Sequence, residues 1–410
     1  MARSTTFKYT VTVVNPGSGN KYYMDGILQT YVTLFPGCTY EFNQDDSTNA
    51  THPLRFATQV DAANSSEYTT GVTTTGTPGS ATAWTKIEVT TSTPYRLFFY
   101  CTSHGGMGNS ITVPQGIATR AFTGGSYPSL TNTIEAVDLT TTGNTFDFGD
   151  MSASKYATGA IGGVTKGLFI GGSPDGGSTN LNTIDQIIIK SLGNSVDFGN
   201  LVTVTNYPCG LGNQTRGVYG GGYAGGYLNN IGYVTIASTG DATDFGDLTV
   251  ARNQFCGFSS PTRGAWAGGT PSTDTIDYVT IASTGNALDF GNLASATAGT
   301  AATSSSTRGV IAGGGTPSKI NVIQHVTIAS TSNTTDFGDL TVAKSNMTLN
   351  GSNNTIGIFG GGLDPSTNVV IDSITFASTG NAQDFGDMKN SSNAGGYGQC
   401  GNSNGHGGLQ

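Results

Sequence analysis

Hydrophobic residues in this chain alternate with polar residues over short stretches, and segments rich in glycine and asparagine separate these stretches. A period of two is the pattern of a strand with one buried face. Residues 7–13 follow this pattern, and we predict further strands over 31–42, 84–89 and 95–100. No stretch has a sustained helical period, so the sequence predicts an all-β protein.

A tripeptide, Asp-Phe-Gly, recurs through the second part of the chain. Its copies begin at Asp147, Asp197, Asp244, Asp289, Asp336 and Asp384, at intervals of 50, 47, 45, 47 and 48 residues. A second marker is a threonine, usually a basic residue, a short apolar run and Gly-Gly. Its copies begin at Thr119, Thr165, Thr215, Thr262, Thr307 and Thr355. Each repeat has room for four short strands, which is the pattern of a β-propeller blade, so we predict six blades.

The phase of the two markers predicts how the ring of blades closes. The chain enters the first blade at the Gly-Gly strand, so segment 388–402 is predicted to return and pair with residues 119–125. Closure removes the sheet edges that would otherwise be exposed. We expect the phenylalanine of Asp-Phe-Gly to fill the space between blades, and its aspartate and glycine to shape a turn. A kinase origin of Asp-Phe-Gly is excluded because a Gly-rich loop and His-Arg-Asp are absent.

The repeats resemble those of the kelch family. The shared features are Gly-Gly after a hydrophobic strand, and an aromatic residue followed by a short apolar stretch, as in residues 244–252. A phenylalanine stands where kelch repeats usually have tryptophan. The resemblance implies a six-bladed kelch-like β-propeller over residues 119–410, closed by the C-terminal strand, and says little about activity.

One loop in the first part of the chain carries candidate metal ligands. Cys101, His104 and Met107 follow a predicted strand, and His52 lies upstream. A thiolate, two imidazoles and a distant thioether are the ligands of a blue-copper site. The chain has only 4 histidines, and two of them fall here. The alternative is that Cys101 is a buried thiol at a strand end and holds no metal.

The first part of the chain resembles the cupredoxin family. The likeness lies in segment 35–42, Phe-Pro-Gly-Cys-Thr-Tyr-Glu-Phe, and in a ligand loop directly before the last strand. It implies a cupredoxin-like β-sandwich over 1–114, a linker over 115–118, and a copper ion bound by His52, Cys101 and His104. Small cupredoxins have the axial methionine at the position of Asn109, whereas this chain has Met107. The axial contact is therefore Met107, an oxygen of Asn109, or absent.

Charge and composition narrow the classes of partner. The formal net charge is −9, which excludes nucleic acid as a partner because phosphates need clustered basic residues. No apolar run is long enough for membrane insertion. The N-terminus lacks the apolar region of a signal peptide, and the 5 scattered cysteines predict a reducing compartment. The repeats contain only His325 and His406, too few for an oxidase copper site of the galactose oxidase kind, so we expect no enzymatic activity.

The combination of domains resembles virion proteins of marine tailed bacteriophages, especially cyanophages, in which Ile-Ala-Ser-Thr-Gly-Asn-x-x-Asp-Phe-Gly repeats recur. Residues 280–291 contain the best copy. The resemblance implies a tail-fibre or capsid-associated protein, synthesised in the host cytoplasm and located in the virion. The first domain would bind other virion proteins and hold a structural copper ion. The propeller would bind a host-surface glycan or receptor, and a homotrimer is expected because fibres are commonly trimeric. The alternative is a copper-binding electron-transfer or oxidase-type protein.

Overall fold

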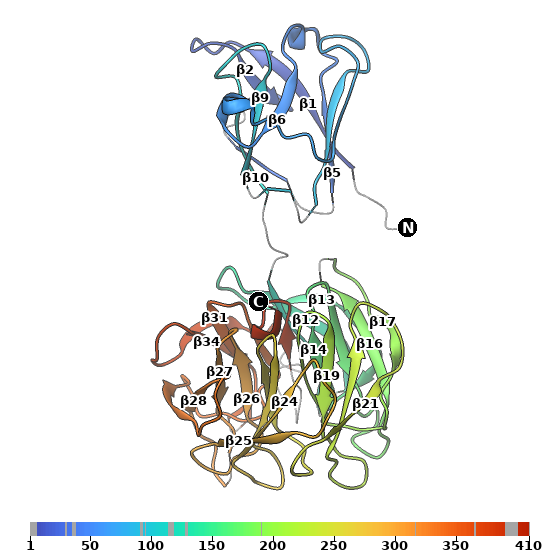
Figure 1. The fold of residues 1–410 in the computed structure, drawn as a ribbon, viewed down its shortest axis with the longest axis vertical. Helices are drawn as coiled ribbons and strands as arrows, with labels where there is room; N and C mark the ends of the chain where they lie inside the picture. Colours follow the sequence, from blue (N-terminus) through green and yellow to red (C-terminus); the bar gives the residue numbers. More distant parts are fainter. Residues whose placement is uncertain are drawn as a thin grey trace. The chain divides into compact units, whose positions relative to one another are not determined.

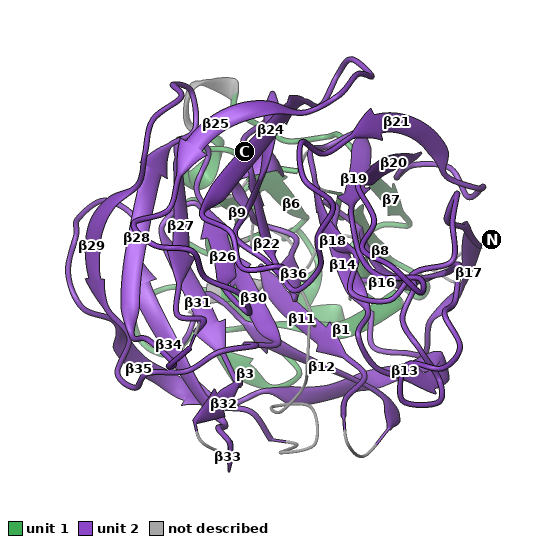
Figure 2. Cartoon of the chain, turned by 90° about the horizontal axis from the view of Figure 1, so that it is seen from below, with its two compact units in different colours: residues 1–117 green, residues 118–410 purple. Residues whose placement is uncertain are grey.

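The computed structural model contains two compact units, residues 1–117 and 118–410 (Figures 1 and 2). The structure describes residues 6–28, 31–34, 38–90, 93–94, 96–113, 119–127, 130–189, 191–315, 317–364, 366–389 and 401–409. The predicted linker, 115–118, lies outside the described residues. All regular elements in the described residues are strands or short 3-10 helices, so the all-β prediction is confirmed.

The first unit is built from two sheets. The six-stranded sheet has the order β3 (Ile27–Leu28), β2 (Lys21–Met24), β1 (Thr6–Val14), β5 (Thr39–Asn43), β8 (Trp84–Glu88) and β7 (Val72–Thr75). The four-stranded sheet has the order β4 (Tyr31–Thr33), β10 (Asn109–Thr112), β9 (Arg96–Cys101) and β6 (Leu54–Ala57). The short 3-10 helices are η1 (Ser47–Asn49) and η2 (Val60–Ser65).

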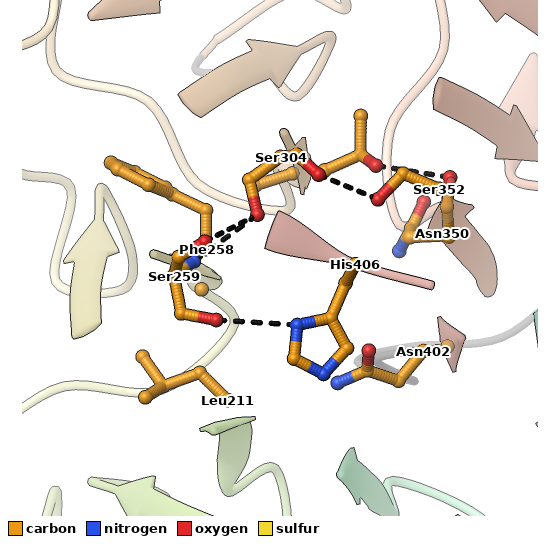
Figure 3. Close-up of a pocket in the computed structure, with 13 residues that line it drawn as sticks. Leu211, Phe258, Ser259, Ser304, Asn350, Ser352, Asn402 and His406 are labelled. Atoms are coloured by element: carbon orange, nitrogen blue, oxygen red, sulfur yellow. Dashed lines mark hydrogen bonds between the residues drawn. The ribbon is translucent and has the colours of Figure 1, made fainter. Parts of the chain in front are cut away.

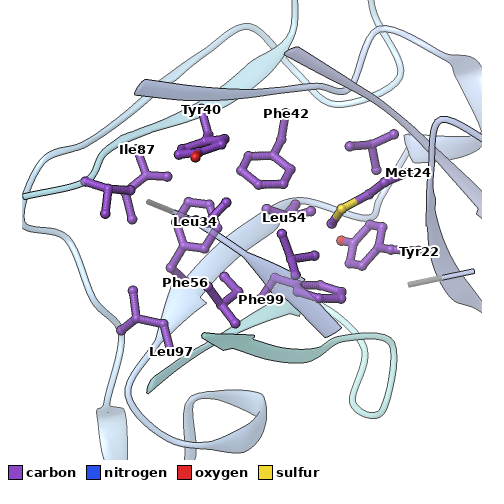
Figure 4. Close-up of a cluster of buried hydrophobic side chains, with 14 of the residues drawn as sticks. Tyr22, Met24, Leu34, Tyr40, Phe42, Leu54, Phe56, Ile87, Leu97 and Phe99 are labelled. Carbon is purple, nitrogen blue, oxygen red and sulfur yellow. The ribbon is translucent and has the colours of Figure 1, made fainter. Parts of the chain in front are cut away.

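Side chains from both sheets form a single core (Figure 4). Tyr22 and Phe42 come from the six-stranded sheet, and Leu54, Phe56 and Phe99 come from the four-stranded sheet. The rings of Phe42 and Phe56 meet edge to face between the sheets, with centroids 5.5 Å apart. Each buried side chain of this kind contributes roughly 1.5–3 kcal/mol, so this core holds the two sheets together.

The prediction of one continuous strand over 31–42 is wrong. The chain forms β4 in the four-stranded sheet and β5 in the six-stranded sheet, so it crosses between them. Both halves bury apolar residues in the same core, and a period of two does not reveal which sheet each half joins. The strand predicted over 95–100 is confirmed as β9, an interior strand, apart from Tyr95, which lies outside the described residues.

The second unit contains six four-stranded antiparallel sheets, here named I to VI. Sheet I has β36 (Asn402–Ser403), β11 (Arg120–Gly124), β12 (Thr131–Asp138) and β13 (Phe146–Lys155). Sheet II has β14 (Gly159–Gly162), β15 (Lys166–Ile170), β16 (Thr183–Ile188) and β17 (Val196–Asn200). Sheet III has β18 (Cys209–Gly212), β19 (Arg216–Gly220), β20 (Asn230–Thr235) and β21 (Thr243–Asp247).

The remaining three sheets repeat this arrangement. Sheet IV has β22 (Cys256–Ser259), β23 (Arg263–Ala267), β24 (Thr275–Thr280) and β25 (Leu288–Asn292). Sheet V has β26 (Ala301–Ser304), β27 (Arg308–Ala312), β28 (Val322–Thr327) and β29 (Thr335–Asp339). Sheet VI has β30 (Leu349–Ser352), β31 (Ile356–Gly360), β34 (Val370–Thr375) and β35 (Gln383–Asp387). A small hairpin, β32 (Leu363–Asp364) and β33 (Ser366–Thr367), and a 3-10 helix, η3 (Gly407–Leu409), complete the unit.

The first strands of the sheets contact one another in sequence. The contacts run from β14 to β18, β22, β26 and β30, and both β30 and β14 contact β36. In sheet I, Ser403 pairs with Ala121 and Asn402 with Phe122. The predicted return of the C-terminal segment to the strand at 119–125 is therefore confirmed for these residues, and residues 390–400 lie outside the described part.

Each Asp-Phe-Gly lies in the fourth strand of its sheet. The strand carries a β-bulge at this point and no turn, so the predicted turn-forming role of the aspartate and glycine is wrong. Phe245 of sheet III packs in one buried cluster with Trp266 of sheet IV, which confirms the predicted role of the phenylalanine between sheets. Equivalent clusters contain Phe198, Phe290, Phe337 and Phe385.

The glycine of Asp-Phe-Gly permits the closest approach between neighbouring sheets. Gly246 has a φ of 148°, and a Cβ there would lie 2.5 Å from the carbonyl oxygen of Gly285 in the hairpin of the next sheet. At the same place the N–H of Gly285 donates to the carbonyl of Phe245 at 2.7 Å. Gly386 makes the equivalent approach to Gly143, which links sheet VI back to sheet I.

Three buried ion pairs brace alternate sheets. In each pair a basic residue leading into a sheet contacts an aspartate on the third strand of that sheet at 2.9 Å: Lys155–Asp185, Arg252–Asp277 and Lys344–Asp372. The equivalent positions in sheets III and V are neutral: Thr205 with Gly232, and Thr297 with Gln324. Removing one partner from a buried pair typically costs about 3–5 kcal/mol, because it leaves the other charge buried alone.

We predict that Gly246→Ala lowers the free energy of unfolding by about 2 kcal/mol more than Gly240→Ala, because an added methyl must push neighbouring backbones apart. Gly240 is the matched control: its φ is +153°, but no atom lies within 4 Å of a Cβ built there. Chemical denaturation of both variants measures the difference. Equal losses would show that the close approach contributes nothing beyond the backbone conformation.

Candidate functional site

Two segments of the first unit meet at one end of its four-stranded sheet. Cys101 is the last residue of β9, and His104 lies in the loop that leads to β10. His52 lies in the loop before β6. Because Leu54 pairs with Cys101 in the ladder between β6 and β9, the two loops are held next to each other.

The structure brings three of the four predicted ligands together. The Sγ atom of Cys101 lies 3.8 Å from Nδ1 of His52 and 3.7 Å from Nδ1 of His104, and all three ligand atoms lie within 4.8 Å of one another. When a metal ion lies about 2.3 Å from a thiolate and about 2.0 Å from an imidazole nitrogen, those two ligand atoms are about 3.5–3.8 Å apart at a tetrahedral or trigonal angle. The three side chains therefore fit a metal ion.

Two of these ligands are buried and the third is exposed. Cys101, a free thiol, is 4% exposed and His52 is 8% exposed, whereas His104 faces solvent. Burial, and after it the imidazole of His104, lowers the pKa of His52. A lowered pKa favours the neutral imidazole, which is the form that binds metal.

The backbone of His52 is fixed by buried polar side chains. Its carbonyl accepts hydrogen bonds from the hydroxyl of Tyr22 at 2.9 Å and from Nε2 of Gln44 at 3.0 Å. Its N–H donates to the carbonyl of Asn49 at 2.8 Å. Burial, and after it the neighbouring Cys101, raises the pKa of Tyr22, so this hydroxyl stays protonated and remains a donor. Such outer contacts orient a metal ligand before the metal binds.

The structure separates the two predicted axial contacts. Asn109 is exposed, and its side-chain oxygen accepts a hydrogen bond from the N–H of Ser110 at 2.8 Å. Met107 is 3% exposed and packs in the same core cluster as Cys101. Met107 is therefore the better-placed fourth contact.

A cleft opens beside the exposed ligand. It has a volume of about 540 Å³ and is lined by Asp61, Glu67, Tyr100 and His104, among others. The carboxylate of Asp61 accepts the N–H of Gly106 at 2.9 Å, which ties the ligand loop to the wall of the cleft. An ion or a small molecule can therefore reach His104 from solvent.

The two histidines of the second unit lie apart from each other. His325 on β28 packs edge-on against Phe337, with ring centroids 5.6 Å apart. His406 is 5% exposed and lies among the first strands of the sheets (Figure 3). Its Nε2 lies 2.9 Å from the carbonyl oxygen of Gly162, and its Nδ1 accepts the N–H of Gly408 at 3.2 Å. A carbonyl can only accept, so Nε2 carries the proton and the ring is neutral.

A chain of serine hydroxyls runs beside His406 (Figure 3). Each hydroxyl donates to the backbone carbonyl of the preceding sheet, from Ser403 to Ser352, Ser304, Ser259 and finally Gly212, at 2.7 to 2.9 Å. In sheets II and III a glycine occupies the serine position. A Cβ at Gly162 would lie 2.0 Å from the carbonyl oxygen of Ser403, so glycine makes room for the C-terminal segment.

The space left along this axis is small. The cavity beside His406 has a volume of about 20 Å³ and is lined by Ser304, Asn350 and Asn402, among others. A polar cavity of this size holds about one water molecule. The described residues around His406 therefore form a hydrogen-bonded region, and this cavity is too small for an organic ligand.

No protein-family model matches the chain, and a search of curated proteins found no significant similarity. In the described part of the chain, no helix combines the length and apolarity needed to cross a membrane. The kelch, cupredoxin and phage resemblances therefore stay predictions from residues and motifs.

We predict that the second unit loses stability as the pH falls from about 6.5 to about 4, because burial lowers the pKa of His406 to about 4. In this window the unfolded chain takes up a proton that the folded chain excludes, so the full effect is about 3 kcal/mol. Denaturant unfolding of the wild type and of His406→Gln at pH 7, 5.5 and 4.5 measures it. The same slope in both proteins would rule out this contribution of His406.

Proposed function

We propose that the second unit is a six-bladed kelch-like β-propeller and that the first is a cupredoxin-like β-sandwich. The support for the propeller is the succession of first-strand contacts and the pairing of β36 with β11. The support for the sandwich is a core shared by two sheets, with candidate ligands in the loop between its last two strands, β9 and β10.

We further propose that the chain is a structural and binding protein of a bacteriophage virion, tail fibre or capsid-associated, and that it has no enzymatic activity. One observation carries this proposal: backbone and buried side-chain contacts between the sheets repeat around the second unit, whereas the loops at their edges vary. A rigid body with variable polar loops suits recognition of a host-surface glycan or receptor.

In this proposal the first unit anchors the protein to other virion proteins, and the assembled form is a homotrimer made in the host cytoplasm. A copper ion bound by His52, Cys101 and His104, with Met107 as axial contact, would cross-link the loop before β6 to the loop after β9. The thiolate and imidazole donors suit copper, and the burial of Cys101 and His52 suits an ion that stabilises the fold.

We predict that Cu²⁺ raises the unfolding midpoint of the first unit and produces visible absorption in the full-length protein. Free copper at a hundred times its dissociation constant adds about 2.7 kcal/mol to the free energy of unfolding. Cys101→Ser abolishes both effects, whereas Cys38→Ser, the other cysteine of this unit, keeps them. A wild-type midpoint that copper leaves unchanged would contradict a structural metal.

We predict that density for the full chain is found in the assembled phage particle, with the second unit exposed, and that the purified full-length protein blocks phage adsorption to its host. Electron microscopy of the particle and adsorption assays measure the two outcomes. The control is the protein unfolded by heat, which should not compete. Absence of the chain from purified particles would rule out the virion role.

The alternative is a copper-binding electron-transfer or oxidase-type protein. The exposed edge of His104 and the cleft beside it favour this alternative, because a redox partner or small substrate could reach the metal there. Reversible one-electron reduction of the copper-loaded protein would support the alternative over a purely structural ion.

A further inference from the structure

Five tyrosines lie in loops at one edge of sheets I to III: Tyr127, Tyr156, Tyr207, Tyr223 and Tyr227. We call this surface the tyrosine face. Each loop follows the second or the fourth strand of its sheet, and these strands run in the same direction, so the loops emerge at one edge. Backbone bridges from Tyr156 to Ser173 and from Asn206 to Tyr223 connect loops of neighbouring sheets. The chain enters β11 at the opposite edge.

The rings of the tyrosine face contact one another. Tyr156 lies 5.1 Å from Tyr127 and 6.0 Å from Tyr207, and Tyr223 lies 5.7 Å from Tyr227, measured between ring centroids. Tyr156 is only 5% exposed, whereas Tyr127 and Tyr227 are 38% and 42% exposed. A buried ring thus supports its exposed neighbour, and part of each exposed side chain faces solvent.

The backbone at Tyr207 adopts a conformation that is unfavourable for tyrosine. Its φ is 56°, in the left-handed region. The equivalent positions of four other repeats are Ala157, Gln254, Gly299 and Asn346, which have φ values of 57°, 51°, 66° and 53°. Glycine and asparagine adopt this conformation readily, whereas a bulky aromatic residue does so at a cost. A costly residue that the fold does not require is an indication of function.

The tyrosine face breaks the regularity of the repeats. The loops after the second strands of sheets IV to VI, residues 268–274, 313–321 and 361–369, contain no tyrosine, whereas the corresponding loops of sheets I and III contain three. The contacts that hold the sheets together do not differ in this way. A local departure from an otherwise consistent pattern is expected where a protein binds something.

The uncharged, aromatic side chains of these loops favour a neutral ligand. The four loops that carry the tyrosines contain no charged residue, and the neighbouring loop of sheet II contains Asp175, whose carboxylate accepts hydrogen bonds from the N–H and hydroxyl of Thr179. Without lysine or arginine, the surface offers nothing to an anionic polymer. The negative π faces of tyrosine attract polarised C–H groups, and the hydroxyls exchange hydrogen bonds. Val202 and Val204, 49% and 45% exposed, add apolar area at the same edge.

We propose that the tyrosine face binds a neutral oligosaccharide, whose C–H faces stack on the rings of Tyr127 and Tyr227 and whose hydroxyls bond to the tyrosine hydroxyls and nearby amides. The proposal rests on the host-binding function proposed above and assigns it to one edge of sheets I to III. Sugars present both of the required groups on one molecule, since each ring has an apolar C–H face and a polar rim.

The test measures binding of the full-length protein to dextran, mannan, laminarin and galactomannan by affinity electrophoresis and saturation-transfer NMR. We expect at least one polysaccharide to bind, and Tyr127→Ala combined with Tyr227→Ala to weaken that binding about tenfold or more. Tyr127→Phe combined with Tyr227→Phe should lose less, because stacking remains. The matched control is Leu288→Ala, in a hairpin at the opposite edge, where the side chain is 60% exposed.

Tyr207→Asn separates a binding role from a structural one. Asparagine suits the left-handed backbone, so the variant should keep or raise the unfolding midpoint while weakening polysaccharide binding. A lower midpoint with unchanged binding would show that Tyr207 serves the fold and would overturn its place in the site.

Two further outcomes separate this inference from the proposed function. If the wild type adsorbs to host cells and the tyrosine variants adsorb equally, the tyrosine face is overturned and the host-binding function stands. If the wild type binds neither cells nor any of the four polysaccharides, both fail. Binding of a proline-rich peptide in place of the polysaccharides would assign this face to a protein partner and also overturn the proposal.

Discussion

The second unit depends on one close contact, in which a glycine backbone in the fourth strand of one sheet meets a backbone carbonyl in the hairpin of the next. A side chain at Gly246 would leave no room for this contact, and Gly386 repeats it where sheet VI returns to sheet I. Because the contact is made by backbone atoms, it fixes the distance between sheets in the same way at each junction. Side chains such as Phe245 then fill the space that this distance leaves.

Contacts between backbones leave the loops free to vary. The serine hydroxyls and the C-terminal segment fill the axis, and the three buried ion pairs brace sheets II, IV and VI, so these polar groups serve the fold. At Tyr156 and Tyr223, backbone bridges also connect neighbouring sheets, whereas the side chains of Tyr127 and Tyr227 are partly exposed. In the first unit the structural residues and the candidate ligands are also separate. The core joins the two sheets, whereas Cys101 and His52 lie at one end of the four-stranded sheet.

The sequence was most informative where structure repeats or where rare residues cluster. Six Asp-Phe-Gly copies predicted six sheets and the return of the C-terminal strand, and the scarcity of histidine pointed to His52 and His104. The function of the Asp-Phe-Gly glycine could not be predicted, because its neighbour is about 40 residues further along the chain. The position of His406 beside the first strands of the sheets and the left-handed backbone of Tyr207 also escaped prediction, because the periodicity of the sequence carries no signal for either.

The pairing of β36 with β11 joins distant parts of the chain, and the hydrogen bond from the N–H of Arg120 to the side chain of Asn404 spans 284 positions. During translation, β11 leaves the ribosome long before β36 is synthesised. The edge of β11 that pairs with β36 therefore stays unpaired while the other five sheets form. A chain cleaved or terminated before residue 402 would keep that edge exposed and would lack the serine and histidine that fill the axis. The pairing of β36 with β11 therefore forms only in chains that extend at least to residues 402 and 403.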